Sequence, residues 1–94
     1  MREYENLIIF NPESDEESIS KKIDELKEFV EKKGKVLNIN KWGVRQLAYP
    51  INKKERGYYV LIEFTSEKEL LPELDHKLKL SKDIIRHSIV RKES

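Results

Sequence analysis

The clearest structural signal in the chain is residues 58–64, which read Tyr-Tyr-Val-Leu-Ile-Glu-Phe. Aromatic and β-branched residues dominate this stretch, and such residues are enriched in β-strands. Successive side chains of a strand point to opposite faces, so the even-numbered residues share one face and the odd-numbered residues share the other. Glu63 lies on the odd-numbered face. Because burying an unpaired carboxylate is costly, we predict that the even-numbered side chains face the core.

Three further strands are predicted on either side of this segment. Residues 3–10 form the first, because their apolar centre ends at an Asn-Pro pair. Residues 36–47 form the second, in which Gly43 suggests a bulge. Residues 84–90 form the last strand, and the polar, basic stretch from Pro50 to Gly57 is predicted to be a connection.

Two helices are predicted between the strands. Ser14 with Glu17, and Ser66 with Glu69, match the capping-box pattern of a helix start. Pro72 is awkward near the start of the second helix, so that helix either kinks or begins later than its capping pattern suggests. The apolar positions at helical spacing are Ile19, Ile23, Leu26, Phe29 and Val30 in the first helix and Leu70, Leu71, Leu74 and Leu78 in the second.

The order strand, helix, strand, strand, helix, strand predicts an α+β, ferredoxin-like βαββαβ fold in a single domain over residues 1–94. Right-handed crossovers place both helices on one face of a four-stranded antiparallel sheet, with the first and third strands in the centre. The helix-free face would then display four large apolar side chains, and apolar patches of this kind tend to meet a partner. Alternatively, a loop or another side chain covers them. The four are Leu7, Ile9, Tyr59 and Leu61.

The charges are numerous but nearly balanced, since 39% of the residues are charged and the net charge is +1. Residues 13–33 hold eight acidic and five basic side chains, whereas residues 35–56 hold one acidic and six basic. Residues 76–94 hold two acidic and six basic side chains. A basic surface beside an acidic helix can bind a polyanion locally. The alternative is that these charge runs are ordinary solvated faces.

Several classes of protein are disfavoured by what the sequence contains. There is no Cys, so neither a disulfide framework nor a thiolate metal site is expected. No apolar stretch approaches the length that crosses a membrane, and the apolar run at residues 7–10 is too short for a signal peptide. We therefore expect a soluble intracellular protein.

The sequence predicts neither a catalytic residue, nor a metal site, nor a cofactor. His76 and His87 lie on different predicted elements, and the three glycines are too isolated to form a phosphate-binding loop. Residues 56–63 partly resemble the third-strand signature of RNA recognition motifs, a family with the same topology. However, that motif presents aromatic residues at positions 58 and 60, which the charge pattern assigns to the core.

A longer match lies at residues 42–51, Trp-Gly-Val-Arg-Gln-Leu-Ala-Tyr-Pro-Ile, followed by Asn-Lys-Lys. This run resembles the signature of the bacterial ribosomal small-subunit protein six family. The opening Met-Arg-x-Tyr-Glu, the Asn-Pro pair at residues 11–12, the Gly-Tyr at 57–58 and the Ile-Arg at 85–86 resemble the same family. The likeness runs through essentially the whole chain in the same order.

The resemblance implies a structural protein of the bacterial small ribosomal subunit, cytoplasmic and ribosome-associated, with no catalysis and no cofactor. Such proteins bind the central domain of small-subunit ribosomal RNA as a heterodimer with small-subunit ribosomal protein eighteen. A partner is physically reasonable, because a chain of nearly zero net charge should bind RNA weakly alone. The alternative is a ferredoxin-like interaction or regulatory module that dimerises through its open sheet face without RNA.

The family signature supplies the candidate protein interface, because its apolar residues lie on an exposed edge segment. The alternative for Trp42 and Tyr49 is packing against the domain's own core. The predicted interface residues are Trp42, Arg45, Leu47, Ala48, Tyr49 and Pro50.

The candidate RNA contacts are mostly cations of the outer strands and of one loop, which would bind phosphate and sugar rather than read bases. Tyr4 could stack on an exposed base, although it could equally be a packed strand aromatic. The predicted RNA-binding residues are Arg2, Tyr4, Lys53, Lys54, Arg86, Arg91 and Lys92.

Overall fold

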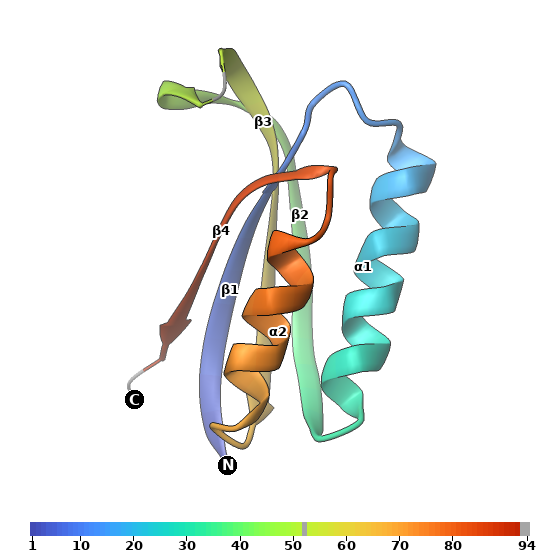
Figure 1. Ribbon diagram of the computed structural model, residues 1–94, viewed down its shortest axis with the longest axis vertical. Helices are drawn as coiled ribbons and strands as arrows, with labels where there is room; N and C mark the ends of the chain where they lie inside the picture. The colour runs from blue at the N-terminus through green and yellow to red at the C-terminus, as the bar shows by residue number, and fades with distance from the viewer. Residues whose placement is uncertain (52, 93–94) are drawn as a thin grey trace.

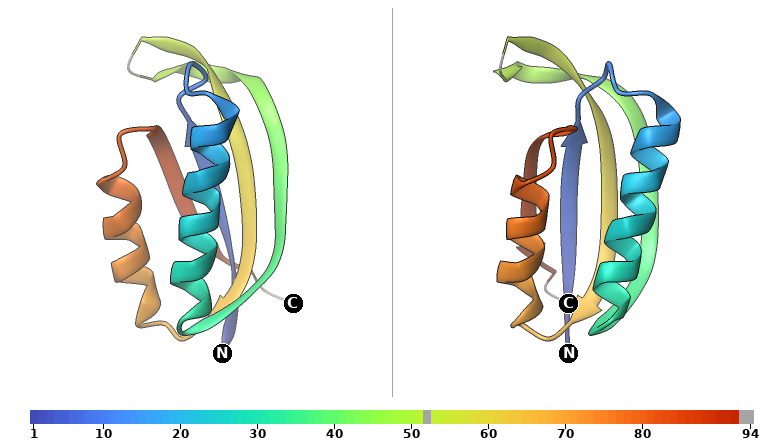
Figure 2. Two further views of the ribbon diagram at one scale, coloured as in Figure 1. Left: turned by 90° about the vertical axis from the view of Figure 1, so that its right-hand side faces the viewer. Right: turned by 45° about the vertical axis from the view of Figure 1, so that its right-hand side comes forward.

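The computed structural model describes residues 1–51 and 53–92. Four strands form one antiparallel sheet in the order β2-β3-β1-β4, and both helices cover the same face of it (Figures 1 and 2). The predicted ferredoxin-like arrangement is therefore confirmed, with β1 and β3 in the centre. The elements are β1 (Arg2–Phe10), α1 (Glu16–Glu31), β2 (Gly34–Ile51), β3 (Lys54–Ser66), α2 (Leu70–Lys79) and β4 (Ile84–Arg91).

The core lies between the sheet and the helices, and the even-numbered residues of the central strands face it as predicted. Ile8 and Phe10 of β1 and Val60 and Phe64 of β3 are fully buried. Tyr4 joins them, with its ring centroid 5.6 Å from that of Phe64. The helices contribute Ile19, Ile23, Leu26, Val30, Leu70, Leu74 and Leu78 to the same cluster.

The start of α1 differs from the capping-box prediction by one residue. The Asp15 carboxylate accepts a hydrogen bond from the backbone N–H of Ser18 at 2.7 Å and so caps the helix. This bond lowers the pKa of Asp15. The predicted cap, Ser14, instead donates its hydroxyl to Asp83 at 3.0 Å and ties the loop before α1 to the loop before β4.

The second capping-box prediction is also wrong, because Ser66 is the buried last residue of β3. Its hydroxyl donates to the carbonyl of Glu67, and α2 begins only at Leu70. Pro72 is consequently the third residue of the helix, where a backbone N–H has no intrahelical acceptor to lose. Of the two alternatives for Pro72, the later helix start is correct.

The long polar connection predicted over residues 50–57 is wrong, because β2 continues to Ile51 and β3 begins at Lys54. Lys53 has a φ of 65°, a left-handed conformation that tight hairpin turns require. Residue 52 lies outside the described residues. The bulge predicted at Gly43 is confirmed, since the pairing with β3 shifts there and Gly43 has a φ of 84°.

The paired ends of β2 and β3 extend beyond β1 and curve toward the β4 side of the sheet (Figures 1 and 2). Gly57 allows the start of β3 to lie close to Ile9 of β1 and Leu47 of β2. A Cβ at position 57 would lie 2.3 Å from Cγ2 of Ile9 and 3.4 Å from Cδ2 of Leu47. Ile9 and Leu47 are each only 7% exposed. Ile9 points to the open face as predicted, but of the two alternatives given for that face the covered one is correct at this position, because the end of β2 lies over Ile9.

Candidate partner and nucleic-acid surfaces

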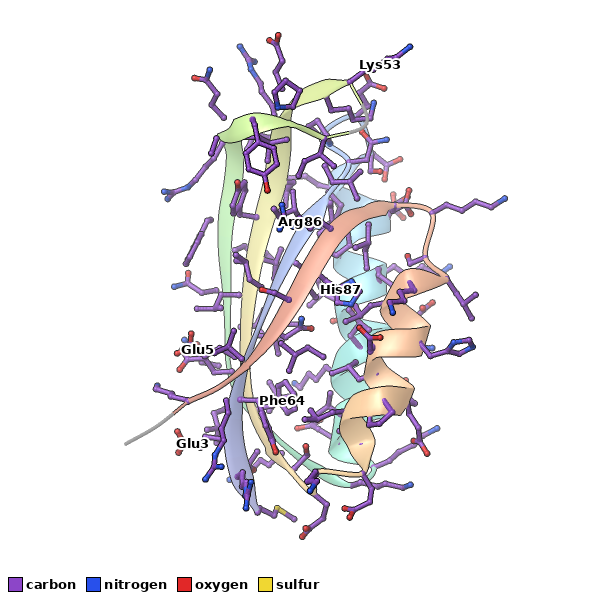
Figure 3. All side chains as sticks on the ribbon, turned by 60° about the vertical axis from the view of Figure 1, so that its left-hand side comes forward. Glu3, Glu5, Lys53, Phe64, Arg86 and His87 are labelled. Carbon is purple, nitrogen blue, oxygen red and sulfur yellow. The ribbon has the colours of Figure 1, made fainter. Side chains whose placement is uncertain are left out.

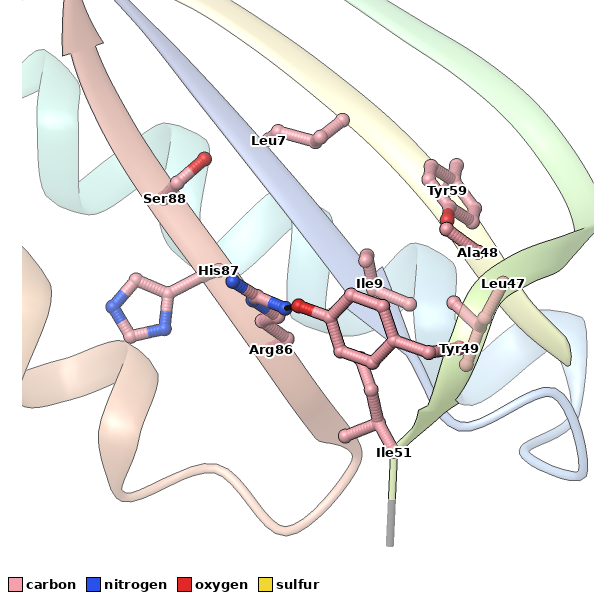
Figure 4. Close-up of a pocket in the computed structure, with 10 residues that line it drawn as sticks. All are labelled: Leu7, Ile9, Leu47, Ala48, Tyr49, Ile51, Tyr59, Arg86, His87 and Ser88. Carbon is pink, nitrogen blue, oxygen red and sulfur yellow. Dashed lines mark hydrogen bonds between the residues drawn. The ribbon is translucent and has the colours of Figure 1, made fainter. Parts of the chain in front are cut away.

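The open face of the sheet holds an apolar hollow between the end of β2 and strand β4 (Figure 4). Its volume is about 230 Å³, and all four strands contribute to its lining. Leu7 and Ile9 of β1 and Tyr59 of β3 are among the lining residues from the central strands. Leu47 and Tyr49 project into it from β2. We name this site the open-face hollow.

A side-chain bridge crosses the open-face hollow between the two outer strands of the sheet. The Arg86 guanidinium on β4 donates a hydrogen bond to the hydroxyl of Tyr49 on β2, and this bond raises the pKa of Arg86 (Figure 4). The guanidinium carbon also lies 5.8 Å from the centroid of the Tyr49 ring. Since β2 and β4 are opposite edges of the sheet, this contact spans both central strands.

A second aromatic group lies further along β2. The Trp42 ring stacks on Tyr59 with a centroid distance of 6.2 Å and an interplanar angle of 15°. The Arg45 guanidinium lies 5.4 Å from the Trp42 ring, within cation–π range. Trp42 remains 38% exposed.

Of the predicted interface residues, Trp42 and Tyr49 place their rings on the open face, and Leu47 projects into the open-face hollow. Arg45, Ala48 and Pro50 are exposed, and Tyr49 is 57% exposed. Leu47 is buried under the curved end of β2. Neither Trp42 nor Tyr49 belongs to the core between sheet and helices.

The predicted RNA-binding cations fall into separate groups rather than one patch. Arg2, Arg91 and Lys92 line one hollow at the start of β1. Lys53 and Lys54 lie in the hairpin turn region at the opposite end of the molecule, whose longest dimension is 37 Å. Figure 3 shows Lys53 at one end and Arg86 on β4 nearer the middle.

Some of these cations already have acidic neighbours. The Lys92 ammonium lies 2.9 Å from Glu63, and the hydrogen bond between them raises the pKa of Lys92 and lowers the pKa of Glu63. The Lys54 ammonium lies 3.6 Å from Glu13. Tyr4 is only 4% exposed, so its ring is a packed strand aromatic and is not accessible to a base in this structure.

The two histidines lie in unrelated surroundings. His87 points toward α2 (Figure 3) and its Nε2 lies 2.7 Å from the Asp75 carboxylate, whereas His76 is exposed on α2. The hydrogen bonds from His87 and then Lys79 lower the pKa of Asp75. Within residues 1–51 and 53–92, no group of three His, Cys, Asp or Glu side chains could hold a metal ion. None of the helices described is long and apolar enough to span a membrane.

Sequence reasoning missed both the hollow and its Tyr49–Arg86 bridge. One signal was present, because Leu47, Tyr49 and Ile51 alternate along β2 and all three line the hollow. Apolar alternation of this kind marks a strand with one covered face. The segment was instead divided between a strand and a connection at Pro50.

Comparison with known proteins matches nearly the whole chain. A family model described as "Ribosomal protein S6" matches residues 3–91. A "Small ribosomal subunit protein bS6" from Desulforamulus reducens is 45% identical over 92 residues, covering 97% of each chain. One of the same description from Clostridium novyi is 44% identical over 94 residues, covering 99% of each. A crystal structure of 30S ribosomal protein S6 from Thermotoga maritima matches with a TM-score of 0.91 at 30% identity, covering 97% of this chain and 87% of that one.

Proposed function

Since this chain belongs to the ribosomal protein S6 family of the small ribosomal subunit, we propose that it binds small-subunit ribosomal RNA together with small-subunit ribosomal protein eighteen. The role is structural: the chain positions RNA and a second protein, as a single domain, in ribosomes of the cytoplasm. No cofactor takes part, and no side chain acts on a substrate.

The placement of exposed cations supports the RNA-binding part of this proposal. Arg2 and Arg91 lie at one end of a molecule 37 Å long, and Lys53 lies at the other. Cations this far apart can hold two stretches of RNA backbone at a fixed separation. Contacts of this type recognise the shape of folded RNA rather than its sequence.

The exposed apolar residues of β2 support the protein-partner part. Trp42 and Tyr49 present aromatic rings on the open face, and the apolar hollow lies beside Tyr49. Aromatic side chains and Arg are the residues that most often anchor a protein interface. Arg45 lies against Trp42 and Arg86 against Tyr49, so each ring carries a guanidinium neighbour.

Reconstitution with the partner protein and a fragment of the small-subunit RNA tests the proposal. One double variant, Arg2→Ala with Arg91→Ala, removes the first cation group, and Lys53→Ala with Lys54→Ala removes the second. A control, Lys21→Ala with Lys27→Ala, removes two exposed charges from α1. Each lost phosphate contact should reduce the slope of log affinity against log salt by about 0.7–0.9, and the control should leave it unchanged.

Two other results would revise the proposal. If the salt slope is unchanged in both test variants, the partner protein supplies the RNA contacts and this chain only presents it. If the chain binds a protein or itself but never retains RNA, the correct function is the interaction module without RNA. The apolar hollow on the open face is the observation that favours this second function.

A further inference from the structure

A charged hollow lies between the turn of the β2–β3 hairpin and the loop that joins β1 to α1. Both segments lie at the same end of the molecule (Figures 1 and 2), and Figure 3 shows Lys53 at that end. The hollow has a volume of about 380 Å³. We name it the hairpin hollow. Its lining residues are Pro12, Glu13, Lys53, Lys54, Glu55 and Arg56.

Three of the lining residues are cations, and two of them come from one strand. Lys54 and Arg56 are two residues apart in β3, so their side chains share a face and their backbones are about 7 Å apart. Lys53 precedes them in the turn. Lys53 and Arg56 are exposed, and among the residues that the structure describes neither forms an ion pair. Arg56 is a cation that the sequence prediction of RNA contacts left out.

The third cation, Lys54, is occupied by a carboxylate of the neighbouring loop. Its ammonium lies 3.6 Å from the Glu13 carboxylate, a longer separation than the 2.9 Å of the Lys79–Asp75 pair. The Lys54 side chain is 27% exposed, whereas that of Glu13 is 81% exposed. Glu13 is therefore the partner that can leave. Ion pairs of exposed groups contribute little to stability, so a phosphate can displace Glu13 from Lys54 at small cost.

The backbone around Glu13 is fixed, so only its side chain has to move. The Glu13 N–H donates to Oδ1 of Asn11 at 3.0 Å, and the Asn11 N–H donates to the Asp83 carbonyl at 2.7 Å. On the other side of Glu13, the Ser14 hydroxyl donates to the Asp83 carboxylate at 3.0 Å. The loop is thus held against the start of β4. A ligand of the hairpin hollow does not have to order this loop, which keeps the entropic cost of binding low.

The balance of charge favours an anionic ligand once Glu13 has moved. The three cations face two carboxylates, Glu13 and Glu55. One positive charge is in excess while Glu13 is in place, and two are in excess when it turns away. Further carboxylates at the start of α1 repel RNA from that side, so a backbone must approach from the hairpin. They are Asp15, Glu16 and Glu17.

We propose that the hairpin hollow binds one phosphodiester group of the RNA through Lys54 and Arg56, and that Glu13 occupies Lys54 until the phosphate displaces it. This inference rests on the proposed function, because RNA is the anion that fills the site. The competing carboxylate weakens the site for polyanions in general. The site fills when Arg2 and Arg91 hold the same RNA at the other end of the molecule, since this raises the local concentration of phosphate at the hairpin.

Glu13→Gln tests the competition, because it removes the charge of the side chain and keeps its size. The affinity of the heterodimer for the RNA fragment should rise about two- to threefold at low salt, and the gain should shrink as salt is added. The gain should disappear in a Lys54→Ala background, because Glu13 then has no cation to occupy. Asp24→Asn is the matched control: Asp24 is exposed midway along α1, and this variant should bind RNA as the wild type does.

Arg56→Ala tests the additional cation. RNA affinity should fall, and the slope of log affinity against log salt should be reduced by about 0.7–0.9 for the lost phosphate contact. Lys27→Ala, which removes an exposed cation from α1, should leave the slope unchanged. Affinity for the partner protein alone should be that of the wild type in both Arg56→Ala and Glu13→Gln. Thermal unfolding of both variants should also match the wild type, because both side chains are exposed.

Unchanged RNA affinity of Glu13→Gln at low salt overturns the inference, and so does a gain that persists in the Lys54→Ala background. A loss of partner affinity in Arg56→Ala with unchanged RNA affinity also overturns it, since the hairpin hollow would then be a protein site. The variant Arg2→Ala with Arg91→Ala separates these failures from failure of the proposed function. If that variant weakens RNA binding and the hairpin variants do not, the chain binds RNA and only the hairpin site is wrong.

Discussion

The two faces of the sheet are covered by different means. On the helix face, Leu and Ile side chains of α1 and α2 pack against the sheet and bury Ile8, Phe10 and Phe64 completely. On the open face no helix is present among the described residues, and cover comes from the curved end of β2 at one end only. The helix face is therefore shielded from solvent, whereas the open face has exposed aromatic rings and carboxylates.

The helix face therefore stabilises the fold, whereas the open face is available for recognition. Burying large apolar side chains on the helix face supplies most of the free energy that opposes chain entropy. The open face holds groups that destabilise or are indifferent to the isolated domain, such as the Glu5–Glu63 pair and the exposed ring of Tyr49. Four comparisons between variants test this division.

The largest effect is expected from Phe64→Ala on the helix face. Phe64 is fully buried and its ring packs on Tyr4, so truncation leaves a cavity and should cost about 3–5 kcal/mol of unfolding free energy. Leu61→Ala, on the open face of the same strand, should cost about 1 kcal/mol because Leu61 is partly exposed. Denaturant titration of both variants measures the contrast, and equal losses would mean that the open face has a core of its own.

The next effect concerns the curve of β2 over the open face. Gly57→Ala places a methyl group 2.3 Å from Cγ2 of Ile9 and should cost about 1–3 kcal/mol. The double variant with Ile9→Ala should be less destabilised than the sum of the two single changes, because Ile9→Ala removes the clashing atom. Strict additivity in this cycle would show that Gly57 matters for another reason.

The helix face was the part of the molecule that the sequence could predict. Its pattern is local: period two in β1 and β3 and helical spacing at Ile19, Ile23 and Leu26. The order of elements then left few ways to close the sheet. The two predicted helix caps were wrong because both serine hydroxyls donate hydrogen bonds outside the helices. Ser14 donates to the Asp83 carboxylate and Ser66 donates to the Glu67 carbonyl.

The open face could be predicted only in part. Strand alternation placed Leu7, Tyr59 and Glu63 on this side correctly. The cover over Ile9 and the contact between Tyr49 and Arg86 depend on the tertiary path of β2 across the sheet. Positions 49 and 86 belong to opposite edge strands, and no periodicity in a sequence relates two such residues.

A smaller effect is expected at the edge of the helix face, where Asp75 joins α2 to His87 of β4. The folded pKa of Asp75 is below its ordinary value because of hydrogen bonds from His87 and then Lys79. The stabilisation is therefore present above the unfolded pKa of about 3.9 and is lost as the pH falls through the lower folded value.

Asp75→Asn should accordingly lose less stability than the wild type between about pH 5 and pH 2. Urea titrations across this range measure the difference in slope. Asp24→Asn, an exposed carboxylate on α1 outside the ion pairs of the described residues, is the control and should keep the wild-type slope. If Asp75→Asn follows the wild-type curve, the contact with His87 does not contribute to folding.

The smallest effect on stability is expected from Tyr49→Phe, which removes the hydroxyl that accepts from Arg86 and keeps the ring. Two interactions could hold the end of β2 on the open face: this solvent-exposed hydrogen bond, or the burial of Leu47 beside Ile9 and Gly57. An exposed hydrogen bond exchanges with water, whereas a Leu at 7% exposure has left water almost entirely. Tyr49→Phe should therefore change the unfolding free energy by less than about 0.5 kcal/mol, while Leu47→Ala should cost about 2–3 kcal/mol. Chemical denaturation of the two variants decides between them. A larger loss in Tyr49→Phe than in Leu47→Ala would make the Arg86 bridge, rather than apolar burial, the contact that shapes the open face.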